Sequence, residues 1–176
     1  DVCSSDLGVR HLLGHGHTRI AYIGGDMHLT TARERCAGLV EEMTALGASV
    51  SPEWVQGDAI TAEDGYAVAT RILAGAERPT AFFSAQNLIT MGVFRALRDR
   101  GLQHSIALVG FDDFQLADLL EPGVTVVAQD PRAMGQRAAE ILFQRMDRDD
   151  EAPDELQTYV IPSRLITRGS GEIRPE

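Results

Sequence analysis

The sequence predicts an α/β fold: a Rossmann-like parallel sheet with helices on both faces, of the kind seen in periplasmic binding proteins. From Thr18 onward, short β-rich runs alternate with longer stretches of helical period, which is typical of βαβ units. The run 106–109 is apolar throughout, as expected of a strand covered on both faces. The 176 residues, 44% hydrophobic and 24% charged, suit one globular domain or two small subdomains.

The first elements follow from local patterns. Residues 1–7, "DVCSSDL", show no period and no cap, so we interpret them as a possible non-native segment and leave them out of the fold. A helix is predicted over 8–16, where the chain reads as if it starts inside a longer protein. Two strands are predicted over 19–25 and 53–58.

Two amphipathic helices accompany these strands. Thr31 and Glu34 have the spacing of a capping box, and the helix that they open is expected to end near Gly47. Thr61 and Asp64 have the same spacing and open the next helix. The apolar stripes are Cys36, Leu39, Val40 and Met43 in the first helix and Tyr66, Val68, Ala69, Ile72 and Leu73 in the second.

The second half continues the alternation. A strand over 80–85 runs into a helix over 87–101 that ends with basic residues and a glycine. A further helix has Asp130 as its N-cap and Pro131 at its first position. Its apolar face is Met134, Ala138, Ile141, Leu142 and Met146. The remaining β-rich runs are 106–111, 124–129, 158–162 and 164–168.

Composition excludes several classes of function. The formal charge of −10 repels phosphate backbones, so this chain by itself is not expected to bind DNA. The sequence has no apolar run of about 20 residues and no signal peptide, which predicts no membrane partner. Cys3 and Cys36 do not form a disulfide framework, and Cys36 lies on an apolar stripe as a reduced core thiol would. We therefore expect a cytoplasmic protein.

Motifs for catalysis and cofactor binding are not found. The "GHG" triplet comes before a strand rather than after one, and "RGSG" lacks the spacing of a serine nucleophile elbow. His11, His15 and His17 have a spacing that can hold a metal, but they lack the glutamate of a zinc hydrolase. A solvated helix end is the preferred interpretation of these histidines. We expect no metal, no cofactor and no enzyme activity.

Polar residues instead gather at the predicted strand ends, where a parallel sheet brings them to one edge. Asp112 can accept two hydrogen bonds from a polyol, while Arg35 balances its charge or forms a fork with it. The alternative is that Arg35 and Asp112 are an ion pair that only holds two loops together. Asp113 is expected to cap the turn around "FQLADLL". The candidate ligand-binding residues are Asp26, Thr31, Arg35, Gln86, Asn87, Asp112 and Gln129.

Seven segments in order carry a family resemblance: "HLLGHGHTRIAYIGGD", "TARERCAG", "GD...GY", "RPTAFFSAQN...MGVFRALRDRGL", "IALVGFDDF", "VTVVAQDPRAMGQRAAEILFQRM" and "VIPSRLITRGS". In this order and spacing they resemble the effector-binding region of LacI/GalR-type transcriptional regulators, and the match covers nearly everything after residue 8. The resemblance implies an N-terminal helix-turn-helix and a hinge helix, followed by two Rossmann-like subdomains that clamp a small effector.

The resemblance also implies a domain arrangement. Residues 8–127 and 156–169 would form the C-terminal effector-binding subdomain, and residues 170–176 a tail. Residues 128–149 would be a crossover strand and helix that belong to an N-terminal subdomain otherwise missing from this chain. The DNA-binding part would be missing as well, so the region is expected to be N-terminally truncated.

Three residues match effector-contacting positions of the family. Thr31 and Arg35 match contacts from the first helix, and Asp112 matches the aspartate that binds hydroxyls or ring nitrogens. Gln86 and Asn87 depart from the usual Asn-Asp pair of the family, which implies a different hydrogen-bond pattern there.

The resemblance implies a function with a small-molecule effector as ligand. Ala59 stands where several members place an aromatic ring against the ligand, which leaves the effector class open. The leading hypothesis is the effector-sensing part of a DNA-binding regulator, with DNA bound only through the missing helix-turn-helix and with a homodimer in the full-length protein. The alternative is the sugar-binding protein of an ABC-type transport system, which shares the fold.

Overall fold

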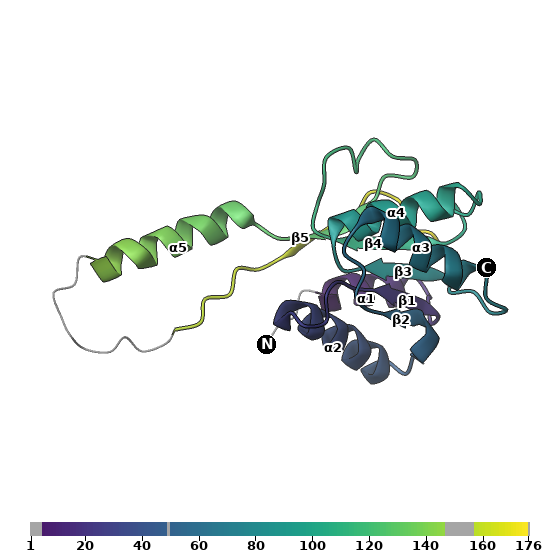
Figure 1. Cartoon of the computed structure of the whole chain (residues 1–176), viewed down its shortest axis with the longest axis horizontal. Helices are drawn as coiled ribbons and strands as arrows, with labels where there is room; N and C mark the ends of the chain where they lie inside the picture. Colours follow the sequence, from purple (N-terminus) through teal and green to yellow (C-terminus); the bar gives the residue numbers. More distant parts are fainter. Residues whose placement is uncertain (1–4, 49, 147–156, 176) are drawn as a thin grey trace.

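The computed structural model describes residues 5–48, 50–146 and 157–175, and its centre is a six-stranded sheet in the order β2-β1-β3-β4-β5-β6. The first five strands are parallel, and β6 is antiparallel to β5. Their bounds are β1 Ile20–Ile23, β2 Val55–Gln56, β3 Ala81–Ser84, β4 Ala107–Phe111, β5 Thr125–Ala128 and β6 Arg164–Ile166. The predicted α/β class with a Rossmann-like parallel sheet is therefore confirmed (Figure 1).

Some of the expected boundaries fall outside this range. Cys3 and most of the segment 1–7 are among the residues that are not described. The same holds for the end of the segment 128–149 and for the first residue of 156–169.

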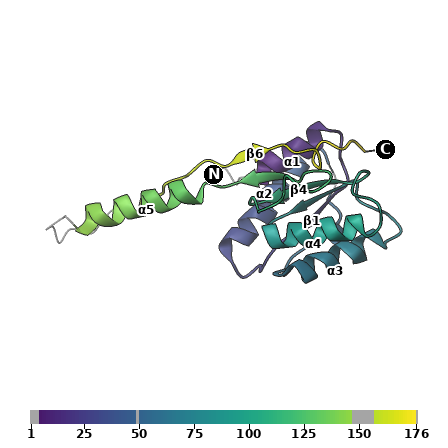
Figure 2. The same cartoon turned by 90° about the horizontal axis from the view of Figure 1, so that it is seen from above.

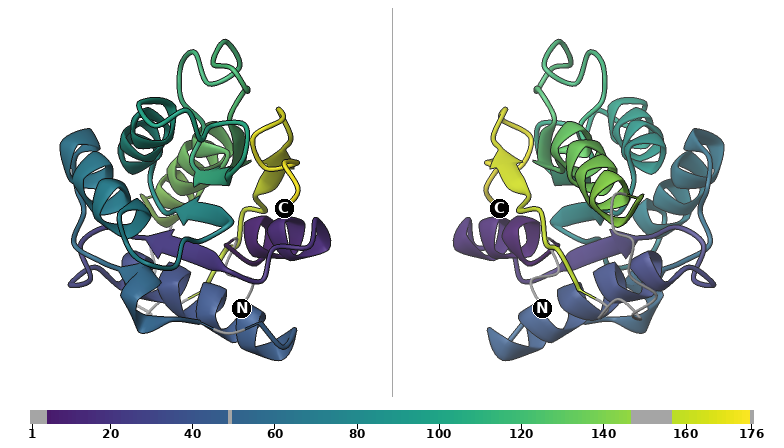
Figure 3. Two further views of the ribbon diagram at one scale, coloured as in Figure 1. Left: turned by 90° about the vertical axis from the view of Figure 1, so that its right-hand side faces the viewer. Right: turned by 90° about the vertical axis from the view of Figure 1, so that its left-hand side faces the viewer.

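Helices cover both faces of the sheet (Figure 3). Helices α1 (Ser5–Gly14) and α2 (Thr30–Ala45) lie on one face, and α3 (Ala62–Leu73) and α4 (Asn87–Arg98) lie on the other. Successive strand residues supply the two cores in turn, because side chains alternate across a strand. Phe82 is buried against α3 and α4, whereas Phe83 is buried in the core that α1 and α2 cover.

The two predicted capping boxes have different outcomes. At α3 the box is confirmed, since Thr61 Oγ1 accepts the N–H of Asp64 at 3.1 Å and Asp64 Oδ2 accepts the N–H of Thr61 at 2.9 Å. At α2 the prediction from Thr31 and Glu34 is wrong, because the helix begins at Thr30 and its N-cap residue makes no side-chain cap bond.

A turn before α2 explains the earlier start. Asp26 Oδ1 accepts the N–H of His28 at 2.8 Å, and the N–H of Leu29 donates to Asp26 O at 3.0 Å. Arg33 then reaches back and donates to the carbonyls of Met27 and His28 at 3.0 and 2.8 Å. The turn over residues 26–29 therefore leads directly into α2, which begins at Thr30.

Glycine allows α3 and α4 to pack closely. A Cβ atom on Gly92 would lie 2.1 Å from Ala62 O and 2.6 Å from Tyr66 N, both backbone atoms. Only glycine permits this approach of α4 to the backbone of α3.

The histidines near α1 are not on a solvated helix end, so that interpretation is wrong. His17 is fully buried, and its ring nitrogens bond to Thr80 Oγ1 at 3.0 Å and to Ile173 O at 2.6 Å. His11 pairs with Glu172 at 2.6 Å. All three partners come from sequence positions far from α1, and local patterns do not reveal them.

Residues 170–173, expected only as part of a tail, are built into the fold. Ser170 Oγ donates to Leu108 O at 2.6 Å, and the N–H of Leu108 donates to Ser170 O at 2.9 Å. Thr125 Oγ1 lies 3.0 Å from Glu172 Oε2. At the other end of the chain, residues 5–7 form the first turn of α1, and Leu7 packs against the core.

Helix α5 (Pro131–Met146) projects away from the sheet and the other helices, and residues 157–163 extend beside it (Figures 1 and 2). Asp130 caps it as predicted, since Asp130 Oδ1 accepts the N–H of Ala133 at 2.9 Å. No α5 residue is buried. Of the two β-rich runs expected after α5, only 164–168 contains a strand, and 158–162 lies outside any strand.

Candidate functional site

The carboxyl ends of the parallel strands meet at one edge of the sheet. Ile23 of β1 is in register with Ser84 of β3, and Ser84 with Gly110 of β4. Phe111 of β4 is in register with Val127 of β5. The residues that follow these strands therefore share an edge, as predicted, and this is where open α/β sheets bind ligands. We call it the strand-edge site.

Arg35 joins three elements at this edge. Its side chain comes from α2, one turn into the helix, and its Nη1 donates to Ala85 O, just past β3, at 3.0 Å. The guanidinium carbon lies 3.9 Å from the ring centroid of Phe111, the last residue of β4. A guanidinium over an aromatic face is attracted by the ring quadrupole, so the cation has a defined position.

Asp112 follows Phe111 directly and has an unusual backbone. Its φ of 66° lies in the left-handed region, and its N–H donates to Val127 O at 2.9 Å. The side chain is half-buried, and burial raises the pKa of this carboxyl, while the nearby charge of Arg35 acts in the opposite direction. A strained residue with a desolvated carboxylate is costly for folding, and such costs gather at functional sites.

Asp113, unlike Asp112, is bonded to other parts of the protein through its side chain. It accepts the N–H of Phe114 at 2.9 Å, in agreement with the expected turn, and it also forms a fork with Arg168, with both oxygens 2.7 Å from guanidinium nitrogens. The bond to Arg168 holds the pKa of Asp113 below its usual range. The two adjacent carboxylates are thus distinct: Asp113 ties the loop to residues after β6, and Asp112 is left at the edge.

The other predicted residues lie on the segments that follow β1, β3 and β5. Thr31 is exposed on α2, one turn before Arg35. Asp26 is part of the loop after β1, where one carboxylate oxygen is used by the N–H of His28. Both belong to the segment that follows β1.

Gln86 and Asn87 stand at the start of α4. Gln86 is the N-cap residue but makes no side-chain cap bond, and its side chain covers Gly25, where a Cβ would lie 2.6 Å from Gln86 Nε2. Asn87 Oδ1 accepts the N–H of Leu88 at 2.7 Å. Gln129 directly follows β5 and lines a hollow shared with α5 and residues 159–163.

Sequence reasoning missed two contributors. Phe111 supports Arg35, and only its position between a strand and an acid pair could have drawn attention to it. Asp58, with a φ of 63°, bonds the loops after β1 and β2 together, since its Oδ1 accepts the N–H of Met27 at 3.2 Å. A "GD" pair after a strand indicates a turn, but not the partner of its carboxylate.

The arrangement supplies a fixed cation beside a hydrogen-bond acceptor, which suits recognition of a polar ligand. In the ranges 5–48, 50–146 and 157–175, no three His, Cys, Asp or Glu side chains are placed to hold a metal ion. Within the same ranges, no helix has the length and apolar character needed to cross a membrane.

Comparison with known proteins defines the class. Residues 9–171 match the family model described as "Periplasmic binding protein-like domain". The chain therefore belongs to this domain family. Its relatives identify the branch as the effector-binding region of LacI/GalR-type transcriptional regulators.

Curated relatives include the HTH-type transcriptional repressor PurR of Haemophilus influenzae (strain PittEE), which is 32% identical over 166 residues, covering 93% of this chain and 49% of the relative. PurR of Pasteurella multocida (strain Pm70) is 31% identical over 170 residues, covering 96% of this chain and 50% of the relative. The chain thus spans about half the length of the curated relatives it matches.

Solved structures give the same result. The lac repressor dimer bound to operator and the anti-inducer ONPF aligns with a TM-score of 0.81 and 27% identity, covering 95% of this chain and 49% of that one. A putative transcriptional regulator from Yersinia pestis aligns with a TM-score of 0.86 and 27% identity, covering 98% of this chain and 61% of that one.

Proposed function

We propose that this chain is the effector-sensing part of a LacI/GalR-type DNA-binding transcriptional regulator. A small molecule, a sugar or a related metabolite, binds in the cleft between two subdomains and thereby alters the affinity of the protein for operator DNA. The observation that carries the proposal is the joint placement of Arg35 and Asp112 at the strand edge. The proposed ligand-binding residues are Thr31, Arg35, Gln86, Asn87, Asp112, Asp26 and Gln129.

Arg35 and Asp112 have complementary roles in this proposal. Arg35 donates hydrogen bonds to the effector from a guanidinium that Ala85 O and the Phe111 ring already hold in place. Asp112 accepts hydrogen bonds from hydroxyl or N–H groups. Because Ala85 O and Phe111 hold the Arg35 guanidinium before the ligand arrives, little of its side-chain entropy is lost on binding.

The exposed face of α5 supports a second subdomain. Leu142, Phe143 and Met146 are 57%, 62% and 69% exposed. Burying one such side chain is worth roughly 1.5 to 3 kcal/mol, so a helix of this kind is stable only when covered. We assign residues 128–149 to an N-terminal subdomain that supplies this cover, while residues 8–127 and 156–169 form the C-terminal subdomain.

The partners follow from the same proposal. The protein acts in the cytoplasm and binds DNA through a helix-turn-helix outside this chain. The chain itself carries a charge of −10, which disfavours contact with phosphate backbones. A homodimer is supported by exposed apolar side chains near the strand edge, Leu88 and Met91 on α4 and Leu116 and Leu119 in the loop after β4. The matched lac repressor structure is a dimer.

Calorimetric titration of the protein expressed from its complete gene tests the proposal, with a panel of pentoses, hexoses and purine bases as candidate effectors. We expect one class to bind, and Arg35→Ala and Asp112→Ala each to weaken it by tens- to hundreds-fold, since losing a charged partner in a closed cleft costs about 2 to 4 kcal/mol.

A matched pair controls for charge. Arg98 and Asp99 are neighbouring exposed residues at the end of α4, at the opposite edge of the sheet, and alanine at either leaves binding unchanged. Unchanged affinity in both Arg35→Ala and Asp112→Ala would show that this pair only holds the two loops together, and would remove the basis of the proposal.

A further inference from the structure

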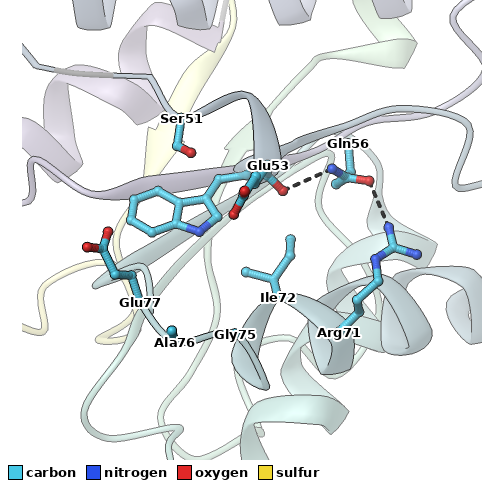
Figure 4. Close-up of a pocket in the computed structure, with 9 residues that line it drawn as sticks. Ser51, Glu53, Gln56, Arg71, Ile72, Gly75, Ala76 and Glu77 are labelled. Carbon is cyan, nitrogen blue, oxygen red and sulfur yellow. Dashed lines mark hydrogen bonds between the residues drawn. The ribbon is translucent and has the colours of Figure 1, made fainter.

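Strand β2 has only two residues (Val55–Gln56), and a side chain ties it to its surroundings. Gln56 Nε2 donates to Glu53 O, in the 3-10 turn η1 (Pro52–Trp54), at 2.9 Å. Nη2 of Arg71, on α3, donates to Gln56 Oε1 at 2.7 Å (Figure 4). The loop after β2 therefore leaves a strand whose last residue is bonded to two other elements.

The loops after β1 and β2 stay bonded to each other beyond the ends of the two strands. The N–H of Gly24 donates to Gln56 O at 2.7 Å, and the N–H of Asp58 donates to Gly25 O at 2.9 Å. The N–H of Ala59 donates to Gly24 O at 3.1 Å. These backbone bonds place Asp58 against the loop after β1, at the strand-edge site.

Asp58 adds a side-chain bond to this junction. Its φ of 63° lies in the left-handed region, and its Oδ1 accepts the N–H of Met27 at 3.2 Å. Nη1 of Arg33, on α2, donates to Met27 O at 3.0 Å. The Met27 side chain covers Gly57, where a Cβ atom would lie 2.5 Å from Met27 Cγ. Met27 is therefore held by its N–H, its carbonyl and its side chain.

Met27 lies between groups that are proposed to bind the effector. Asp26 precedes it directly, and α2, which carries Thr31 and Arg35, begins at Thr30. A shift of Met27 moves Asp26 and the first turn of α2, because few residues lie between them to absorb it. The bond from Asp58 thus fixes a segment that contains proposed ligand-binding residues on both sides.

We propose that Asp58 is a positioning residue of the strand-edge site. It acts through Met27 and not by contact with the effector: it holds the loop after β1 so that Asp26 and the first turn of α2 keep one arrangement. A loop that is ordered in advance loses less conformational entropy when the effector binds, which raises the affinity. This inference rests on the proposed function.

Two substitutions separate the acceptor oxygen of Asp58 from its charge and its backbone conformation. Asp58→Gly keeps the left-handed conformation, which glycine adopts freely, but removes the acceptor. Asp58→Asn keeps both the conformation and an acceptor oxygen for the N–H of Met27, and removes only the charge. Asp99→Asn, at the end of α4, removes an exposed charge at the opposite edge of the sheet and is the matched control.

Calorimetric titration of the protein expressed from its complete gene measures the effect on affinity, with the same panel of pentoses, hexoses and purine bases. For the compounds that bind the wild type, we expect Asp58→Gly to weaken binding roughly three- to tenfold, as the loss of one hydrogen bond would. Asp58→Asn and Asp99→Asn are expected to bind within about twofold of the wild type.

Amide hydrogen exchange followed by NMR tests the loop without an effector. The Met27 amide is expected to exchange several-fold faster in Asp58→Gly than in the wild type, and Asp58→Asn to restore the slower rate. The Ala133 amide, which donates to Asp130 Oδ1 at 2.9 Å, has the same kind of bond elsewhere in the chain and serves as the reference. Its rate is expected to be the same in all three proteins.

Three results would overturn the inference. Wild-type affinity in Asp58→Gly would show that the loop needs no support from this side chain. Equal losses of affinity in Asp58→Gly and Asp58→Asn would assign the effect to the charge, and an unchanged Met27 exchange rate in Asp58→Gly would show that Asp58 does not hold the loop.

The Arg35→Ala variant distinguishes this failure from failure of the proposed function. If Arg35→Ala weakens binding and Asp58→Gly does not, only the inference is wrong. If no compound of the panel binds the wild type, or if Arg35→Ala and Asp112→Ala both bind as the wild type does, the proposed function is wrong and the inference falls with it.

Discussion

Replacing Asp112 by asparagine is expected to stabilise the folded chain at neutral pH. Asparagine tolerates the left-handed backbone conformation, with its φ of 66°, as well as aspartate does, so only the charge changes. Burial raises the pKa of the Asp112 carboxyl above its usual value, which means that the folded state holds this proton more tightly than the unfolded state. Ionisation therefore lowers stability as the pH rises from the usual Asp pKa through the raised one.

The size of the effect follows from the surroundings of Asp112. The side chain is only half-buried, and Arg35 offsets part of the cost of burial. Removing one poorly placed charge commonly adds about 0.5 to 2 kcal/mol, and we expect about 0.5 kcal/mol here. For a chain of this length that corresponds to a rise in Tm of roughly 1 to 2 °C.

Thermal unfolding of the wild type and D112N, followed by circular dichroism between about pH 3 and about pH 8, measures this difference. The gain in Tm is expected to be near zero at the acid end and to grow as the carboxylate ionises. It is also expected to be larger in an Arg35→Gln background, where nothing offsets the charge. A gain independent of pH, or a loss of stability at pH 7, would refute the reasoning that Asp112 is kept at a cost to the fold.

Three further predictions concern other parts of the chain. Burial lowers the pKa of His17, so the unfolded chain takes up this proton at a higher pH than the folded chain, and the free energy of unfolding decreases below about pH 6.5. Between about pH 7 and 5.5, the urea midpoint should therefore fall less in His17→Gln than in the wild type. Equal falls in the two proteins would contradict this. The isolated chain is expected to self-associate through α5, and sedimentation should show Leu142→Gln with Phe143→Gln shifted toward monomer, whereas a monomeric wild type would show that α5 is already covered. The isolated chain should give no sequence-dependent mobility shift with duplex DNA below about 1 μM at physiological salt, and such a shift would contradict the assignment of DNA binding to another segment.

The fold could be predicted from the sequence because its elements carry their own signals. The apolar run at β4, the alternation with amphipathic helices and the Thr61 capping box are all local, and the structure confirms each of them. The start of α2 was predicted wrongly because the deciding bonds come from the loop after β1 and not from Thr31.

The strand-edge site could be predicted only in outline. That residues after β1, β3 and β4 share an edge follows from the parallel topology. The partners do not: Arg168 meets Asp113 from 55 residues away, and Ile173 meets His17 from 156 residues away. Likewise, neither the left-handed backbone of Asp112 nor the ring of Phe111 beneath Arg35 has a signature in residue type or spacing.

The bond between His11 and Glu172 has a consequence for the order in which the chain folds. The two residues are 161 positions apart, and all six strands and α5 lie between them in the sequence. The contact between α1 and Glu172 therefore closes a loop that contains nearly the whole chain. The entropy of closing a loop grows only with the logarithm of its length, and the separation costs little in final stability. The separation instead lowers the rate of folding, because contacts this distant in sequence form slowly. Before residues 170–173 have packed onto β4 and β5, the apolar side chains of α1 and of these two strands are exposed to other chains. The chain is most prone to aggregate in this interval.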